Sequence, residues 1–353
     1  MGVLRYMAQA FPTFNPTIFS GVSAGSINAS YLAQGEPFAV ATERGVELWE
    51  NLHFKEVMQT NFSSLFRMFV RWTYDMSVAK VTRKLLFKSL LDATPLALTL
   101  ASHIHFWKIS RAIRSGAVDG LSVSATNYHD GRTTVFFDST IPIAEWRREQ
   151  RRGVRTTIRV RHIMASCSIP LLFEPVRIGD FLYGDGSLRF SYPLSPAIHM
   201  GATHILGISI RPKLHEDALG FRPDHIGMGF VAGAVLNSMF LDSIEADYEH
   251  LCRLNEEARG TKMRKVQAYL VRPSQDVGAL AVSFLDDVPF HLRQLLRSTA
   301  NPNELGDFLS YLMFSPGYLK ALIRLGMEDA EKHHEQLKCF LALEGHHCMP
   351  VSA

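Results

Sequence analysis

A serine stands between two glycines in the segment Gly21-Val22-Ser23-Ala24-Gly25, where a short β-prone run gives way to a helical pattern. A strand, a tight turn and a helix in this order present a serine hydroxyl on a strained turn, where it can act as a nucleophile. Gly21 and Gly25 would allow close backbone approach on each side of the turn. The amide of Ala24 would lie at a helix N-terminus, which stabilises developing negative charge. The pattern favours a nucleophilic Ser23, although a turn serine without chemistry fits the same five letters.

A serine nucleophile needs a base, and Asp185 in Tyr183-Gly184-Asp185-Gly186 is the second candidate. The apolar run before it predicts a strand that ends at this carboxylate. An aspartate has an unperturbed pKa of about 3.9, so it is ionised at neutral pH and can accept a proton. An aspartate between Gly184 and Gly186 is also typical of a plain turn.

Histidine offers a rival base, because Ser–Asp–His is the usual order in α/β-hydrolases. No loop context singles out any of the histidines that follow Asp185, which include His199, His204, His215, His225 and His250. His204 opens an apolar strand, which favours a buried structural histidine. The pairs His333-His334 and His346-His347 have no carboxylate or cysteine ligands at suitable spacing, so solvated side chains are expected there and no metal site is predicted.

The composition restricts the class of protein. The 353 residues are 47% hydrophobic and 20% charged, which supports a buried core and excludes wholesale disorder. A balance of 37 basic and 34 acidic side chains argues against a dedicated nucleic-acid binder. Four scattered cysteines form no CxxC pair, so free thiols are expected. Neither a secretory signal nor an apolar stretch of about 20 residues is visible, and we expect a cytoplasmic protein.

Strands alternate with helices along the chain, which indicates a layered α/β fold. Strands are expected at 17–19, 121–126, 133–137, 181–183, 204–210 and 266–271. Helical patterns cover 2–9, the stretch from the Ser23 turn to Gly35, most of 48–114, 161–167, 230–255 and 278–343.

Several blocks, taken in order, resemble the patatin-like phospholipase family. Gly21–Ala29 resembles the family's nucleophile segment, Ala165–Phe173 the segment before its acidic strand, and Tyr183–Gly186 its catalytic Asp-Gly element. Leu121–Thr126, with the turn at Asp130-Gly131, and the helical stretch Asp242–Asn255 also fit. The similarity covers most of residues 1 to about 275.

The resemblance implies a three-layer α/β/α patatin-like fold with a mostly parallel central sheet. It implies an acyl hydrolase domain over 1–275, with a helical insertion at about 48–114, followed by a helical C-terminal extension over 276–353. It also implies a Ser–Asp dyad that needs no histidine and no cofactor. Ser23 would attack the ester of a phospholipid or another acyl lipid, and Asp185 would be the base. A transacylase would use the same residues.

The sequence departs from the family pattern in two ways. The family normally has a glycine-rich strand and turn before its first helix, whose amides form the oxyanion hole, whereas Met1–Tyr6 resembles the helix just after that loop. The alternative function is therefore a catalytically silent protein that binds a lipid surface or a partner. Ser187 follows Asp185-Gly186 where the family more often has glycine or alanine.

Two segments could contact an anionic membrane peripherally. Asn61–Trp72 interleaves aromatic and basic residues, which suits a helix lying in the interface, but also an ordinary amphipathic helix on the core. The arginine-rich run 147–161 could bind anionic headgroups, at about 1 kcal/mol per basic residue. A solvated helix face and strand edge would explain that run equally well.

Overall fold

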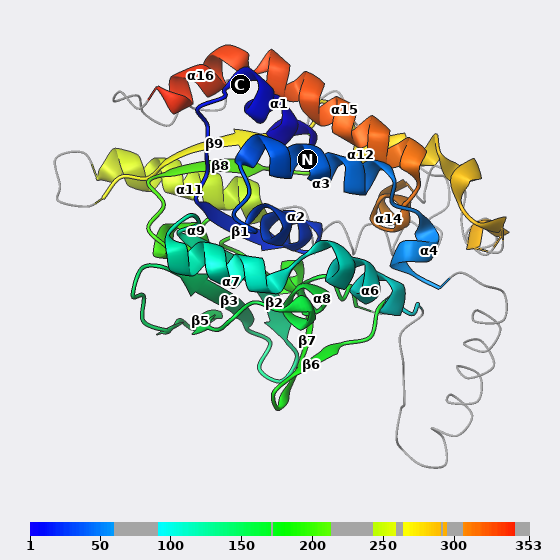
Figure 1. The fold of residues 1–353 in the computed structure, drawn as a ribbon, viewed down its shortest axis with the longest axis horizontal. Coiled ribbons are helices and arrows are strands. Elements are labelled where there is room, and N and C mark those ends of the chain that lie inside the picture. The colour runs from blue at the N-terminus through cyan, green and yellow to red at the C-terminus, as the bar shows by residue number, and fades with distance from the viewer. Residues whose placement is uncertain are drawn as a thin grey trace.

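The computed structural model describes residues 1–59, 91–170, 172–212, 243–258, 264–290, 292–294 and 306–342. Helices cover both faces of a central sheet, which is the three-layer α/β/α fold expected from the sequence (Figure 1). The described strands of the sheet are β1 Ile18–Val22, β2 Gly120–Asn127, β3 Thr133–Ser139, β4 Trp146–Arg147, β5 Arg151–Arg155, β6 Val176–Ile178 and β7 Phe181–Asp185. A separate parallel pair consists of β8 His204–Ile208 and β9 Gln267–Val271.

The seven-stranded sheet is mixed. Its order is β4-β5-β3-β2-β7-β6, and β1 also pairs with β2. The pairs β1–β2 and β3–β5 are parallel, while the other pairs in this sheet are antiparallel. The expectation of a mostly parallel sheet is thus met only in part, because tight turns join β2 to β3 and β6 to β7. Gly131 and Gly179 adopt positive φ angles of 66° and 60° in these turns, a conformation that glycine adopts without steric cost.

Strand β2 pairs with two different strands along one of its edges. Strand β3 pairs with it from Gly120 to Thr126 and so occupies the other edge. Strand β1 lies along the first part of the free edge and ends with Val22 opposite Ser124. Strand β7 enters from the opposite direction and ends with Asp185 opposite Ala125. The ends of β1 and β7 therefore meet on adjacent positions of β2.

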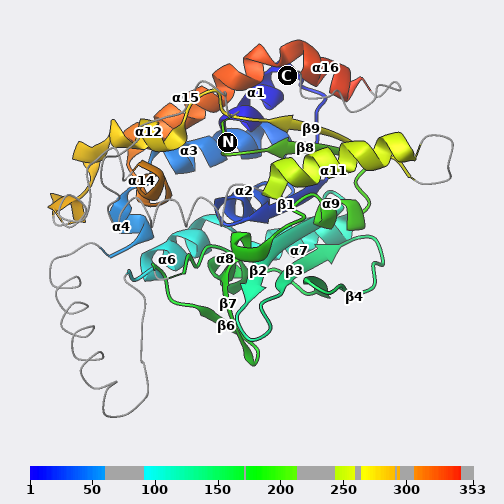
Figure 2. The same cartoon turned by 180° about the vertical axis from the view of Figure 1, so that it is seen from behind.

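Alternation along the strands decides which helices cover which face. Leu121 and Val123 of β2 are fully buried in a core that also contains residues of α2, α7 and α8. On the opposite face, Ile18 packs with α9 and α11, which lie toward the viewer in Figure 2. These helices span Ala24–Leu32 (α2), Phe106–Ser115 (α7), Val160–Ser166 (α8), Ser195–His199 (α9) and Ser243–Glu257 (α11).

The C-terminal helices pack on the first helix of the chain (Figure 1). In α1 (Gly2–Ala10), Gly2 lies directly against the backbone of Ile323 in α15 (Pro316–Lys332), and Gly326 lies against the backbone of Val3. The described residues of 276–290, 292–294 and 306–342 are thus largely helical, as expected, but the boundary at 275 stays a prediction. The remaining helices of the described residues are α3 Phe38–Glu50, α4 Phe54–Val57, α6 Thr94–His103, α12 Val277–Val282, α14 Gly306–Leu312 and α16 His334–Leu341, with 3-10 turns η1 Gly186–Arg189 and η2 Leu285–Asp287.

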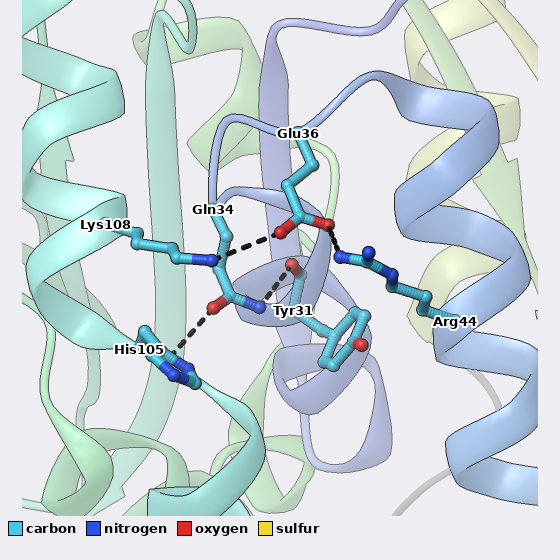
Figure 3. Close-up of polar contacts among 6 residues, drawn as sticks. All are labelled: Tyr31, Gln34, Glu36, Arg44, His105 and Lys108. Atoms are coloured by element: carbon cyan, nitrogen blue, oxygen red, sulfur yellow. Dashed lines mark hydrogen bonds and ion pairs between the residues drawn. The ribbon is translucent and has the colours of Figure 1, made fainter.

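Polar contacts fix the C-terminal end of α2 to its neighbours (Figure 3). Gln34 accepts a hydrogen bond from the amide of His105 at 2.8 Å, just before α7. The carboxylate of Glu36 pairs with Lys108 of α7 at 3.2 Å and with Arg44 of α3 at 2.8 Å. Because α2 begins at the Ser23 turn, these contacts hold the helix that carries the candidate nucleophile.

Several expectations fall partly or wholly outside the described residues. The segment Asn61–Trp72 lies there, as do His215, His225 and the pair His346-His347. Within the described ranges, no helix is long and apolar enough to cross a membrane. Cys167, Cys252 and Cys339 are free thiols.

Candidate active site

Ser23 has an unusual backbone conformation, with φ of 50° and ψ of −129°. Among the residues that the structure describes, it is the only non-glycine residue with a positive φ. A conformation of this kind costs about 1–3 kcal/mol and persists only where the surroundings enforce it. Here it turns the chain from the end of β1 directly into α2, which is the geometry that presents a serine hydroxyl on a sharp turn.

The two glycines that flank Ser23 play different structural roles. A Cβ on Gly21 would collide with the backbone carbonyl of Gly25, so the turn needs glycine at position 21. A Cβ on Gly25 would meet no atom within 4 Å. The expected close packing on both sides is therefore confirmed for Gly21, whereas Gly25 faces open space beside the turn.

Asp185 is fully buried at the end of β7. Its Oδ1 accepts a hydrogen bond from the amide of Ser187 at 2.8 Å. Burial raises the pKa of Asp185 to about 6, and this rise is opposed by hydrogen bonds from the Ser187 amide and from the side chains of Ser23 and Ser187. The carboxylate is thus mainly ionised at neutral pH. Its pKa lies closer to neutral pH than that of a solvent-exposed aspartate, which makes it a better proton acceptor.

The structure brings Ser23 and Asp185 together across the edge of β2. Ser23 follows Val22, and Val22 and Asp185 face adjacent residues of that strand. The Ser23 side chain is close enough to lower the Asp185 pKa as a hydrogen-bond donor. It makes no hydrogen bond of normal geometry to the carboxylate, however, and Asp185 Oδ2 is buried without a partner. Contacts between catalytic groups are often loose before substrate binds, and this geometry fits that state.

Glycines on both sides of Asp185 allow close approach of their neighbours. A Cβ on Gly186 would overlap the carbonyl of Ser124 and the side chain of Val22. A Cβ on Gly184 would overlap the phenol of Tyr128, whose pKa is raised by burial and by the charge of Asp185. Gly186 thus lets the end of β7 lie against Val22, the residue before Ser23, and Gly184 leaves room for the ring of Tyr128.

The N-terminus of α2 lies directly after Ser23, and its side chain makes no capping hydrogen bond to that helix. The amide of Ala24 therefore stands at the positive end of the helix dipole, without a preceding intrahelical carbonyl. Ala24 is exposed, so this end of the helix is accessible. Such an amide can donate to a developing oxyanion.

The described histidines do not join this pair. His199 stacks on Trp146, and His204 hydrogen-bonds with Thr203 at 3.0 Å. In the described ranges, none of the hydrogen bonds of Ser23 or Asp185 involves a histidine, and no group of three or more potential metal ligands comes together. The histidines at 333–334, which were expected to be solvated, are partly exposed and partly buried against tyrosines. His334 is half-buried and bonds with Tyr6 at 2.8 Å, and half-buried His333 bonds with Tyr269 at 2.5 Å.

The arginine-rich run forms β4, β5 and the beginning of α8. Arg152 and Arg155 hydrogen-bond to neighbouring residues, and the guanidinium of Arg151 lies 4.2 Å from the centre of the Tyr192 ring. Arg147 and Arg148 are exposed at the outer edge of the sheet. Only part of the run is therefore available to solvent.

A family model described as Patatin-like phospholipase matches residues 1–198, a range that contains Ser23, the end of α8 and Asp185. The chain belongs to this family. None of the curated proteins compared matches the chain. Patatin-like phospholipases are usually hydrolases of lipid esters, so family membership supports lipid acyl hydrolysis in general terms.

The sequence did not reveal which side chains hold the patatin-like turn. The amide of Ser23 donates to Oγ of Ser166 at 2.9 Å. The carbonyl of Ser23 accepts from the hydroxyl of Ser26 at 2.7 Å. The block Ala165–Phe173 places serines next to the end of a predicted helix, which is a signal in the sequence, but their contact with the Ser23 turn depends on the tertiary structure.

The two flanking glycines should respond differently to alanine. Gly21→Ala should destabilise the protein by about 1–3 kcal/mol or more, because the new methyl group meets rigid backbone. Gly25→Ala is the matched control and should be neutral or stabilising by up to about 1 kcal/mol, because it lies in a helix beside open space. Urea unfolding of both variants checks this, and equal losses of stability would contradict it.

The buried carboxylate should make stability depend on pH. The pKa of Asp185 is raised from 3.8 to about 6 on folding. Between these two pH values the folded state keeps a proton that the unfolded state has lost, and at higher pH the folded state must carry a buried charge, which lowers the free energy of unfolding. Asp185→Asn should therefore be more stable than wild type at pH 7.5, by at most about 3 kcal/mol, and the difference should vanish near pH 4. Urea midpoints at the two pH values measure it. A difference independent of pH, or a less stable variant at pH 7.5, would refute the assignment.

Proposed function

We propose that this protein hydrolyses acyl esters of lipids, with Ser23 as nucleophile and Asp185 as general base. The observation that carries the proposal is the strained backbone of Ser23, at φ of 50°, next to a fully buried carboxylate. Strain of this kind concentrates at functional sites, and a bare turn serine has no need of it. Membership of the patatin-like phospholipase family supports the same chemistry.

The proposed reaction has two stages. Asp185 takes the proton of the Ser23 hydroxyl as Oγ attacks the ester carbonyl, and the Ala24 amide donates to the resulting oxyanion. The ester C–O bond then breaks, the alcohol leaves with the proton from Asp185, and an acyl-enzyme remains. In the second stage Asp185 deprotonates a water, which attacks the acyl carbonyl. The bond between the acyl group and Ser23 Oγ then breaks, Asp185 returns the proton to Ser23 Oγ, and the fatty acid leaves. An alcohol acceptor in place of water would make the same site a transacylase.

A second candidate is a silent patatin-fold protein that binds a lipid surface or a partner. The observation that favours it is the exposure of Ala24 together with the open space beside Gly25. An amide in contact with water stabilises an oxyanion less than one in a water-excluded site. Labelling and turnover of the folded chain separate the two functions.

A fluorophosphonate should label Ser23 in the wild-type protein and should not label Ser23→Ala. Asp185→Asn should lower ester turnover by about 100-fold or more, because general-base catalysis contributes about 10²–10⁴-fold. Turnover of a soluble ester by wild type should rise with pH through about 6 and then level off, as Asp185 ionises. Mass spectrometry of the labelled peptide and a pH–rate profile provide the measurements. A folded wild-type chain with neither labelling nor turnover would favour the silent protein.

We also propose that the edge of the sheet contacts anionic membranes. Arg147 and Arg148 are exposed in and beside β4, and the ion pairs of the described residues involve neither side chain. An enzyme that acts on packed lipids must reach a charged surface, to which each arginine contributes about 1 kcal/mol.

Reversing both charges, in Arg147→Glu with Arg148→Glu, should weaken binding to phosphatidylserine-containing vesicles by at least about tenfold. Binding to neutral vesicles should be unaffected. Arg253→Glu with Glu249→Lys, on exposed positions of α11, is a control that alters surface charges elsewhere without changing the net charge. Vesicle sedimentation at two salt concentrations measures the effect. Unchanged binding of the double-reversal variant to phosphatidylserine-containing vesicles would refute this proposal.

A further inference from the structure

The backbone of Ser23 is held on both of its polar groups by buried serines. Its N–H donates to Oγ of Ser166 at 2.9 Å. Its carbonyl accepts from the amide and the hydroxyl of Ser26, at 2.8 and 2.7 Å. Both serines are 0% exposed, so water cannot replace these bonds. Ser26 lies three residues along the same helix, whereas Ser166 reaches the turn from a distant part of the chain.

Ser166 also links the turn to the carboxylate. It is the last residue of α8, and Ser168, two residues further on, contacts Asp185. The carbonyl of Ser168 accepts a hydrogen bond from the amide of Asp185 at 2.8 Å. The hydroxyl of Ser168 donates to the carbonyl of Met164, which fixes this segment to α8. One short segment, Ser166–Ser168, thus contacts the backbones of Ser23 and of Asp185.

We infer that Ser166 is a positioning residue, which keeps Ser23 in its strained conformation and its hydroxyl directed at Asp185. The inference rests on the proposed function for its effect on turnover. Without the Ser166 hydroxyl, the Ser23 amide loses its acceptor and the turn can relax toward ordinary backbone angles. The Ser23 hydroxyl would then move away from the carboxylate, while the surfaces that bind the lipid would stay in place.

The test compares Ser166→Ala with Ser30→Ala. Ser30 is also 0% exposed, lies in α2 and has a hydroxyl without a hydrogen-bond partner, so its removal deletes a buried hydroxyl but no bond to the turn. In Ser166→Ala we expect kcat for a soluble ester to fall by about 10- to 100-fold with KM nearly unchanged, since a misplacement of about 1 Å can cost 100-fold. Fluorophosphonate labelling should slow in parallel. Ser30→Ala should stay within about twofold of wild type, and Ser166→Thr, which retains an acceptor oxygen, should recover part of the lost rate.

A second measurement does not depend on activity. Hydrogen exchange of the Ser23 amide, followed by NMR at pH 7, should accelerate by at least about tenfold in Ser166→Ala and not in Ser30→Ala, because protection reports the bond itself. Unchanged exchange of this amide would overturn the inference, as would a Ser166→Ala enzyme with wild-type kcat. If wild type neither labels nor turns over ester, the proposed function fails, and the exchange rates alone decide whether Ser166 holds the turn.

Discussion

One edge of β2 determines the geometry of the candidate site. Strand β1 leaves this edge after Val22, and β7 reaches the adjacent position at Asp185, from the opposite direction. The encounter of two residues 162 positions apart therefore depends on the register of two ladders. A slip of one residue in the β7 ladder would turn Asp185 to the opposite face of the sheet. Gly186 permits this register, because a Cβ at that position would overlap the backbone carbonyl of Ser124.

The same site is costly for the fold. Ser23 occupies a disfavoured backbone conformation, and Asp185 carries its charge in a fully buried position. Neither feature improves packing. The surrounding contacts compensate for them, through serines that bind the backbone of the turn and through the anchoring of α2 at Glu36 (Figure 3). Conflict between local stability and the native conformation is expected where a protein performs chemistry.

Local patterns in the sequence predicted much of this architecture. The strand, turn and helix around Ser23, and the strand that ends at Asp185, follow from short apolar runs bounded by glycine. Other features could not be predicted, because they depend on contacts made only in the folded chain. The role of Ser166 depends on where α8 ends in space, and the open side of Gly25 depends on what lies nearby. The hydrogen bond between His333 and Tyr269 could not be predicted either, because the two residues belong to elements that meet only in the folded chain.

The close crossing of α1 and α15 has a kinetic consequence. Gly2 touches the backbone of Ile323, so α1 finds this partner only after the roughly 320 residues between them have been made. At translation rates of about 5–20 residues per second, the ribosome needs roughly 15 to 60 seconds to cover that interval. Throughout it, the apolar face of α1 has no α15 to cover it, although the strands near Ser23 have already emerged. The packing of α15 on α1 therefore forms late relative to the strands near Ser23, and chaperones that shield apolar segments have this period in which to act.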